Sequence, residues 1–233
     1  MNSTLKLVMF DLDGTLVETG TEIALAVNDT LRHFDLPAVS EAQVFGWIGK
    51  GTRELLIQSL AGSMQSDSGQ VDDRYDLAQI LAEFGRHYER RCGTNSRLYP
   101  KVRETLTELK AAGVKLAIVT NKDMHYTNIV LRDYQLNDFF DLVIGGDSLP
   151  TKKPDPAGIL HCLSTFRIDA EQALFIGDSS IDAAAARSAN VAVWLLPYGY
   201  NMNQSVQTAR PDRVIDDIAS ILEFDFLDGA SPY

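Results

Sequence analysis

Five short runs of apolar, β-branched residues stand out along the chain, and each is continuous rather than alternating. They occupy residues 5–10, 115–119, 142–144, 173–176 and 191–195. A strand that is covered on both faces has a continuous apolar sequence, and such strands are typical of parallel sheets. The pattern therefore predicts five buried parallel strands.

Helical patterns lie between these runs from residue 102 onward. They cover residues 102–112, 126–134, 157–166 and 181–189. Gly113 stops the first of these helices, and Pro156 stands at the start of the third. A regular alternation of strands and helices favours a sheet with helices on both faces. We therefore expect an α/β fold built on a doubly wound parallel sheet, with a Rossmann-like core.

The connection between the first and second runs departs from this alternation. A single crossover helix would suffice, yet residues 11–114 lie between the two runs. Within residues 17–92 of this connection the patterns are helical only, and they cover residues 22–34, 41–48, 52–61 and 75–90. A polar stretch at 63–73 interrupts them. We expect a helical cap over residues 17–92, inserted into a catalytic α/β core formed by residues 1–16 and 93–233.

The composition is that of a globular protein. Of the 233 residues, 45% are hydrophobic and 23% are charged, which predicts a packed core rather than a disordered chain. No apolar run approaches the roughly 20 residues that a membrane-spanning helix needs, and residues 1–4 lack the layout of a signal peptide. Only two cysteines, Cys92 and Cys162, are present, which does not suggest a disulfide framework. We expect a cytoplasmic protein without a membrane partner.

The net charge is −11, which disfavours a nucleic-acid partner because phosphate backbones favour basic surfaces. The same charge repels a small anionic substrate at long range. A metal ion, lysines or backbone N–H groups would have to overcome that repulsion locally. Basic residues beside acidic motifs are therefore candidates for an anion site.

Two carboxylates follow the first predicted strand, in the sequence Asp11-Leu12-Asp13-Gly14-Thr15. At the carboxyl end of a buried strand, Asp11 and Asp13 would face a ligand crevice. Such a pair divides the work between a nucleophile or metal ligand and a general acid or base. Taken alone the pattern is only moderately specific, because calcium loops and ordinary turns also use Asp and Gly.

Three more sets of polar residues lie after later strands or on a loop. Thr120 and Asn121 follow the second strand, where a hydroxyl and backbone N–H groups hold an anion. Lys153 lies on a loop, and Asp178 and Asp182 follow the fourth strand as carboxylates that suit Mg²⁺. Each set has a purely structural interpretation as a helix cap or a solvated loop. Their common order and position nevertheless favour a single site.

The ordered combination resembles the haloacid dehalogenase superfamily over essentially the whole chain. The motifs are D-x-D-G-T at 11–15, T-N at 120–121, K-K-P at 152–154 and G-D-S-x-x-D at 177–182. The resemblance implies a Mg²⁺-dependent phosphatase or phosphomutase, because dehalogenases and phosphonate hydrolases of the superfamily lack the second aspartate, Asp13.

The resemblance also implies a role for each motif residue. Asp11 would attack phosphorus and form an aspartyl-phosphate, while Asp13 would protonate the leaving alcohol and later deprotonate the attacking water. Thr120 and the backbone near Asn121 would hold the phosphoryl oxygens, and Lys153 would neutralise their charge. The ligands implied for Mg²⁺ are Asp11, the main-chain carbonyl of Asp13, Asp178 and, as an additional ligand or an outer acid, Asp182.

The substrate depends on the cap, where residues 47–55 contain a glycine-rich turn. The turn looks like the specificity loop of phosphoglycolate phosphatases, in which Lys50 or Arg53 would bind a substrate carboxylate. It is also similar to the cap of β-phosphoglucomutase, whose arginine grips a distal phosphate. Hydrolysis of 2-phosphoglycolate is the leading hypothesis. A sugar-phosphate phosphatase, a phosphomutase and a non-catalytic binding protein are the alternatives.

Other polar residues have simpler interpretations. Tyr198 and Tyr200, in a segment that resembles the C-terminal part of phosphoglycolate phosphatases, favour loop packing over substrate contact. The histidines lack metal-ligand spacing and are interpreted as surface or core residues; they are His33, His87, His125 and His161. We expect a small phosphorylated metabolite as the partner, and the sequence does not determine the oligomeric state.

Overall fold

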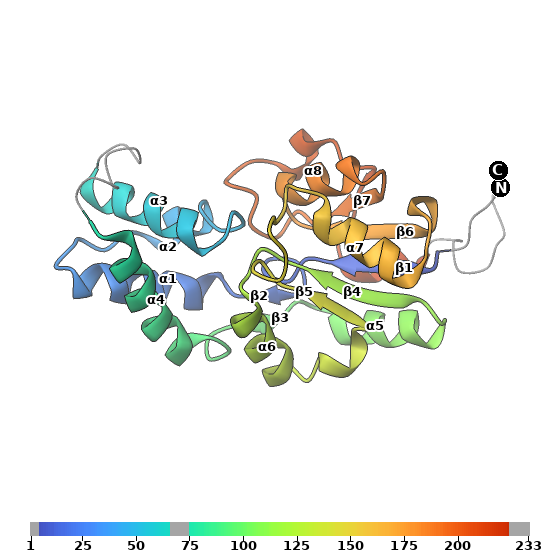
Figure 1. Cartoon of the computed structure of the whole chain (residues 1–233), viewed down its shortest axis with the longest axis horizontal. Helices are drawn as coiled ribbons and strands as arrows, with labels where there is room; N and C mark the ends of the chain where they lie inside the picture. The colour runs from blue at the N-terminus through green and yellow to red at the C-terminus, as the bar shows by residue number, and fades with distance from the viewer. Residues whose placement is uncertain (1–4, 66–74, 224–233) are drawn as a thin grey trace.

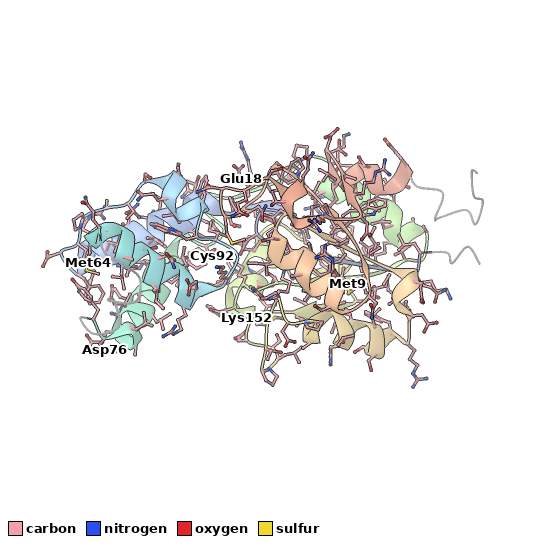
Figure 2. The ribbon with its side chains drawn as sticks, turned by 90° about the horizontal axis from the view of Figure 1, so that it is seen from above. Met9, Glu18, Met64, Asp76, Cys92 and Lys152 are labelled. Carbon is pink, nitrogen blue, oxygen red and sulfur yellow. The ribbon has the colours of Figure 1, made fainter. Side chains whose placement is uncertain are left out.

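The computed structural model describes residues 5–65 and 75–223. The described chain has two parts, a sheet flanked by helices and a group of helices beside it (Figure 1). Figure 2 places Met9 in the sheet part, Met64 and Asp76 at the outer end of the helical part, and Cys92 near the junction. Residues 1–4 and residues 66–73 of the predicted polar stretch lie outside the described residues.

The main sheet of the described chain has six strands, all parallel, in the order β5-β4-β1-β6-β7-β8. Their bounds are β1 (Leu7–Phe10), β4 (Lys115–Val119), β5 (Leu142–Ile144), β6 (Ala173–Gly177), β7 (Ala192–Leu195) and β8 (Arg213–Val214). Each of the five apolar runs forms a strand, so the prediction of a doubly wound parallel sheet is confirmed. Strand β8 was not predicted, because two residues are too few to leave a hydrophobic pattern.

Helices cover both faces of this sheet. They are α5 (Val102–Ala111), α6 (Met124–Asp133), α7 (Ala157–Phe166) and α8 (Ser180–Ser188). In the central strand β1, Val8 and Phe10 share one hydrophobic core with α5 and α6, whereas Leu7 and Met9 share a second core with α7 and α8. Successive residues of a strand point to opposite faces of the sheet. All four side chains are fully buried because helices cover both faces.

The register of the central strands brings their carboxyl ends level. Phe10 of β1 pairs with Ile118 of β4 on one side and with Ile176 of β6 on the other. The residues that follow these strands therefore emerge along one edge of the sheet. In parallel sheets this edge is where ligands bind.

The helical part consists of α1 (Gly20–His33), α2 (Glu41–Phe45), α3 (Thr52–Met64) and α4 (Leu77–Arg91). Buried side chains from three of these helices meet in its interior, among them Leu31, Leu60, Ile80 and Phe84. Ser40 and Gln43 form a capping box at the start of α2, and the Asp76 side chain caps α4. The predicted helix at 41–48 is shorter in the structure, because α2 ends before Gly46.

Two short strands connect the parts, β2 (Val17–Glu18) and β3 (Arg97–Leu98), and they pair in antiparallel fashion. Short 3₁₀ turns complete the described chain at Asn137–Phe139, Ala170–Gln172, Val206–Ala209 and Ile218–Glu223. The division into a cap at 17–92 and a core at 1–16 and 93–233 stays a prediction. Among the described residues, no helix combines the length and apolar character that crossing a membrane requires, and the cytoplasmic location also stays a prediction.

Candidate active site

Asp11 directly follows β1, at the edge of the sheet where the carboxyl ends of the central strands lie side by side. Its backbone N–H donates to the Ile176 carbonyl at 2.9 Å, so the strand pairing continues through Asp11. Thr120 is held in the same way after β4, because its N–H donates to Ile144 at 3.0 Å. Asp178 follows the last residue of β6. The structure thus brings the three motifs after these strands to one place.

Lys153 lies between two carboxylates at this edge. Its Nζ is 2.9 Å from Oδ1 of Asp11 and 2.7 Å from Oδ1 of Asp182. Burial raises the pKa of Asp11 to about 6, although the charge of Lys153 opposes the rise. Burial by itself would lower the pKa of Lys153, but the charges of Asp11 and Asp182 outweigh it and raise that pKa, so the ammonium form persists.

Asp178 is buried between the first loop and a later one. Its Oδ1 accepts from the Thr15 hydroxyl at 3.0 Å, and its Oδ2 accepts from the Tyr200 backbone N–H. Burial raises the pKa of Asp178 well above its ordinary value, and the neighbouring Asp182 and Asp11 add to the rise.

Three carboxylates share this space, and Asp11, Asp178 and Asp182 each offer an oxygen within 4.8 Å of the others. Lys153 supplies one positive charge against them. An oxygen-rich cluster with an excess of negative charge fits a hard divalent cation such as Mg²⁺. Both oxygens of Asp182 already accept hydrogen bonds within the protein. Its Oδ2 accepts from the Ser179 backbone N–H and hydroxyl, and its Oδ1 accepts from Lys153.

Asp13 has different partners from Asp11. Its Oδ1 accepts from Lys122 Nζ at 3.0 Å and from the Thr19 hydroxyl at 2.8 Å. Gly14, directly after Asp13, has a φ of +84°, a conformation that favours glycine. A Cβ at Gly14 would lie 2.2 Å from Oδ2 of Asp178, so the backbone approaches that carboxylate too closely for any side chain.

Lys122 and its partners also lie at this site, although the sequence pattern gave them no role. Lys122 Nζ contacts both oxygens of Asp13, at 3.0 and 3.2 Å, and donates to the Tyr88 hydroxyl of α4 at 2.5 Å. That hydroxyl lies 3.3 Å from Glu22 of α1. Burial by itself would lower the pKa of Lys122, because it disfavours the charged form. The negative charge of Asp13 outweighs this effect and raises the pKa of Lys122 above its ordinary value. The position of Lys122 directly after Thr120-Asn121 was the available signal.

Asn121 joins the two parts of the molecule. Its side-chain amide donates to the Gly49 carbonyl of the helical part and to the Lys153 carbonyl, each at 2.8 Å. Thr120 Oγ1 accepts from the Lys122 backbone N–H at 3.2 Å and faces the space beside Asp11. The Asn121 amide thus positions the loop that carries Lys153.

A cleft of about 610 Å³, open to solvent, separates the two parts above this edge. The sheet part contributes polar residues that include Asp11, Asp13, Thr120, Lys122 and Asp178. The helical part contributes mostly apolar side chains, namely Ile23, Ile48, Leu55, Phe84 and Tyr88. Gly49, Gly51 and Thr52 of the predicted turn also line it, with Figure 2 showing the neighbouring Lys152 at the boundary between the parts.

Lys50 and Arg53, the cap cations predicted to bind substrate, are exposed and lie outside this lining. Both side chains flank Gly51 and Thr52, which do face the cleft. The turn therefore contributes Gly51 and Thr52 to the lining of the cleft, while Lys50 and Arg53 are exposed beside them. Their role in substrate binding stays a prediction.

The loop after β7 supports the site through its two tyrosines. The Tyr198 hydroxyl donates to the Thr15 carbonyl at 3.1 Å, and the Tyr200 hydroxyl accepts from the Gly20 N–H at 2.6 Å. Tyr198 fits the predicted loop packing. Tyr200 does more than pack, because its backbone binds Asp178 and its side chain lines the cleft.

Two of the histidines come together in space although their sequence spacing gave no sign of it. His33 of α1 and His87 of α4 lie 3.4 and 3.0 Å from the same Glu83 oxygen, and their ligand atoms are close enough for a metal ion. His125 and His161 are exposed.

A model of the haloacid dehalogenase-like hydrolase family matches residues 8–196. The chain is 40% identical over 222 residues to a phosphoglycolate phosphatase of Haemophilus influenzae (strain 86-028NP), covering 95% of this chain and 99% of that protein. A phosphoglycolate phosphatase of Vibrio cholerae is also 40% identical, over 94% of this chain and 96% of its own length.

Solved structures show the same fold. A predicted phosphoglycolate phosphatase from Haemophilus somnus superposes with a TM-score of 0.87 at 38% identity, covering 94% of this chain and 97% of that one. The family match spans both the edge residues after β1 and those after β6. The chain therefore belongs to the haloacid dehalogenase-like hydrolase family and groups with its phosphatases.

Proposed function

We propose that this chain is a Mg²⁺-dependent phosphate-monoester hydrolase that works through an aspartyl-phosphate on Asp11. The observation that carries the proposal is the separation of two carboxylates on one loop. Asp11 contacts Lys153 at 2.9 Å, whereas Asp13 contacts Lys122 and Thr19. Two acids in different environments suit two different roles, nucleophile and general acid.

In the first step, a carboxylate oxygen of Asp11 attacks phosphorus and the bond to the leaving oxygen breaks. Oδ1 of Asp11 already accepts from the Leu12 N–H at 2.8 Å and from Lys153, which leaves Oδ2 to attack. Asp13 donates its proton to the leaving oxygen. The Thr120 hydroxyl and Lys153 bind the phosphoryl oxygens, and these fixed dipoles and charges stabilise the transition state.

In the second step, water attacks the phosphorus of the aspartyl-phosphate. Asp13, now ionised, takes the proton of this water, and the bond between phosphorus and Asp11 breaks. Phosphate leaves, while Asp11 and Asp13 return to their starting states. The apolar side chains of the helical part reduce the access of bulk water during the first step.

The residues fit a Mg²⁺ ion. Asp11, Asp178 and the main-chain carbonyl of Asp13 would hold it, and Asp182 would act from outside because both its oxygens are engaged by Lys153 and Ser179. When bound, the ion neutralises the carboxylates and the phosphoryl group. The raised pKa values of Asp11 and Asp178 are consistent with a cluster that needs this charge.

For the substrate we propose 2-phosphoglycolate. The curated relatives at 40% identity carry the name phosphoglycolate phosphatase, and they match over nearly their whole length. A sugar-phosphate phosphatase or a β-phosphoglucomutase-like enzyme is the second candidate, but the arginine that would grip a distal phosphate, Arg53, is exposed. A non-catalytic protein on this fold is disfavoured, since Asp11, Asp13 and Lys153 are all present. A cytoplasmic location accords with such a substrate.

The test is a panel of phosphate esters with the purified protein and Mg²⁺, measured as release of inorganic phosphate. We expect 2-phosphoglycolate to have the highest kcat/KM. Far faster turnover of sugar phosphates or nucleotides would reject this substrate. Interconversion of phosphate positions without net phosphate release would identify a mutase.

A further inference from the structure

We infer that Lys122 is the residue that recognises the carboxylate of the substrate. The inference rests on the proposed function, because it concerns how a phosphorylated two-carbon acid would be told apart from other phosphate esters. It assigns specificity to the loop after β4 rather than to the charged residues of the glycine-rich turn.

Positive charge is unevenly distributed around the cleft. Lys122 is the only cationic side chain among the described residues that line it. Its side chain is 4% exposed, so its charge is directed at the cleft and its immediate partners. Lys153 is also buried, but it lies between Asp11 and Asp182, where the proposed mechanism uses it for the phosphoryl oxygens.

Lys122 lies close to the carboxyl group that would protonate the leaving oxygen. A leaving oxygen that takes a proton from Asp13 must lie within about 2.6–3.2 Å of that carboxyl group. In 2-phosphoglycolate the carboxylate is joined to this oxygen through a single methylene group. Lys122 Nζ lies 3.0 and 3.2 Å from the two oxygens of Asp13, so the same ammonium reaches a carboxylate at that position. A charge on a longer substrate would lie beyond it.

Apolar and aromatic side chains line the cleft that Lys122 faces. Leu55, Phe84, Tyr88 and Tyr126 line the same cleft as Lys122, and the Lys122 ammonium lies 4.8 Å from the centre of the Tyr88 ring. An ion pair is stronger where water is excluded than on an exposed surface. The alternative cations, Lys50 and Arg53, are exposed to solvent.

Glu22 does not compete for this role. Its Oε2 accepts from the Gly93 N–H at 2.9 Å, and its Oε1 lies beside the Tyr88 hydroxyl, which separates it from Lys122. Lys122 therefore keeps a face toward the cleft while Tyr88 and Asp13 fix its position.

The experiment compares two esters that differ only at the recognised group. 2-Phosphoglycolate carries a carboxylate, and 2-hydroxyethyl phosphate carries a hydroxymethyl group in its place. Lys122 also touches Asp13, so Lys122→Met slows both reactions. The ratio of the two kcat/KM values cancels that common loss. We expect this ratio to fall about 10- to 100-fold in Lys122→Met, as is usual for losing a hydrogen-bonded charge.

The rival variants are Lys50→Met and Arg53→Met, in which we expect the ratio to stay within about twofold of the wild type. If Lys122→Met does not fold, as judged by thermal melting, Lys122→Gln replaces it, because its amide still donates to Asp13 or Tyr88. A ratio that is unchanged in the Lys122 variant, or that falls in the Lys50 or Arg53 variant instead, overturns the inference alone. A wild-type enzyme with no preference for phosphoglycolate overturns the proposed substrate and the inference with it.

Discussion

The ammonium nitrogen of Lys153 lies 2.9 Å from Oδ1 of Asp11, and this contact joins the loop after β5 to the end of the central strand. The same nitrogen lies 2.7 Å from Asp182 at the start of α8. Three segments that are far apart in the chain therefore meet at one buried charge.

Lys153→Met removes the charge that accompanies Asp11. We expect kcat to fall by about 10²- to 10³-fold, as it does when one electrostatic stabiliser of a transition state is removed. Lys152→Met is the matched control, because Lys152 is adjacent but exposed, and we expect a change of less than about threefold. Steady-state phosphate release measures both variants. Equal losses in the two would show that the effect belongs to the loop and not to the ion pair.

Asp11→Asn removes the attacking carboxylate. We expect turnover to fall by at least about 10⁴-fold, because an amide does not form the covalent intermediate. In the wild type, rapid quenching during turnover and mass spectrometry should detect a phosphoryl group on Asp11. Full activity of Asp11→Asn would exclude the covalent scheme.

Asp13→Asn removes the proton donor but keeps the shape. We expect the release of an alkyl alcohol to slow by about 10²- to 10⁴-fold. 4-Nitrophenyl phosphate needs little protonation of its leaving group, so the burst of nitrophenol should persist while later hydrolysis of the aspartyl-phosphate stays slow. Pre-steady-state absorbance measures the burst. Equal slowing of the first step for both leaving groups would contradict a general-acid role.

Metal removal should make stability depend on pH through Asp11. Burial raises its pKa in the folded protein from 3.8 to about 6, so the folded state binds more protons than the unfolded state in this range. When a chelator has removed the metal, the contribution of Asp11 to the free energy of unfolding is complete below about pH 4 and is lost as the pH rises toward 6. We expect the melting temperature of wild type relative to Asp11→Asn to fall across that window.

Mg²⁺ should reverse this loss, because it neutralises the ionised cluster. We expect the ion to raise the melting temperature of the wild type by several degrees at pH 7 and much less at pH 4. Asp11→Asn should respond more weakly, since it lacks one ligand. A Mg²⁺ effect that is independent of pH would argue against binding at the carboxylates.

Gly14→Ala tests the close approach of the first loop to Asp178. Gly14 and Gly113 share positive φ values, +84° and +78°, but an added Cβ meets Asp178 only at Gly14. Gly113→Ala should cost about 1 kcal/mol from backbone strain and leave kcat unchanged. Gly14→Ala should cost about 1–3 kcal/mol more and abolish most of the activity, because it displaces a ligand carboxylate. Thermal melting and phosphate release distinguish the two.

The strands and the motif positions were accessible from the sequence for local reasons. A strand that is covered on both faces is apolar throughout, as Leu7–Phe10 is, and that pattern survives in one dimension. Because parallel strands end at one edge of the sheet, placing Asp11, Thr120 and Asp178 after three such strands was enough to predict that they meet. Strands β2 and β8 have two residues each and carry no such pattern.

Contacts between distant segments were decided only by the tertiary structure. Lys122, in the loop after β4, meets both Asp13 after β1 and Tyr88 of α4, and no spacing in the chain encodes that approach. The glycine-rich turn contributes Gly51 and Thr52 to the cleft lining, and substrate binding by Lys50 or Arg53 stays a prediction. The sequence by itself determined which chemical groups gather at the sheet edge. Which charge faces the substrate depends on how two separately formed surfaces pack together, because the orientation of a side chain across an interface follows from the packing of both sides.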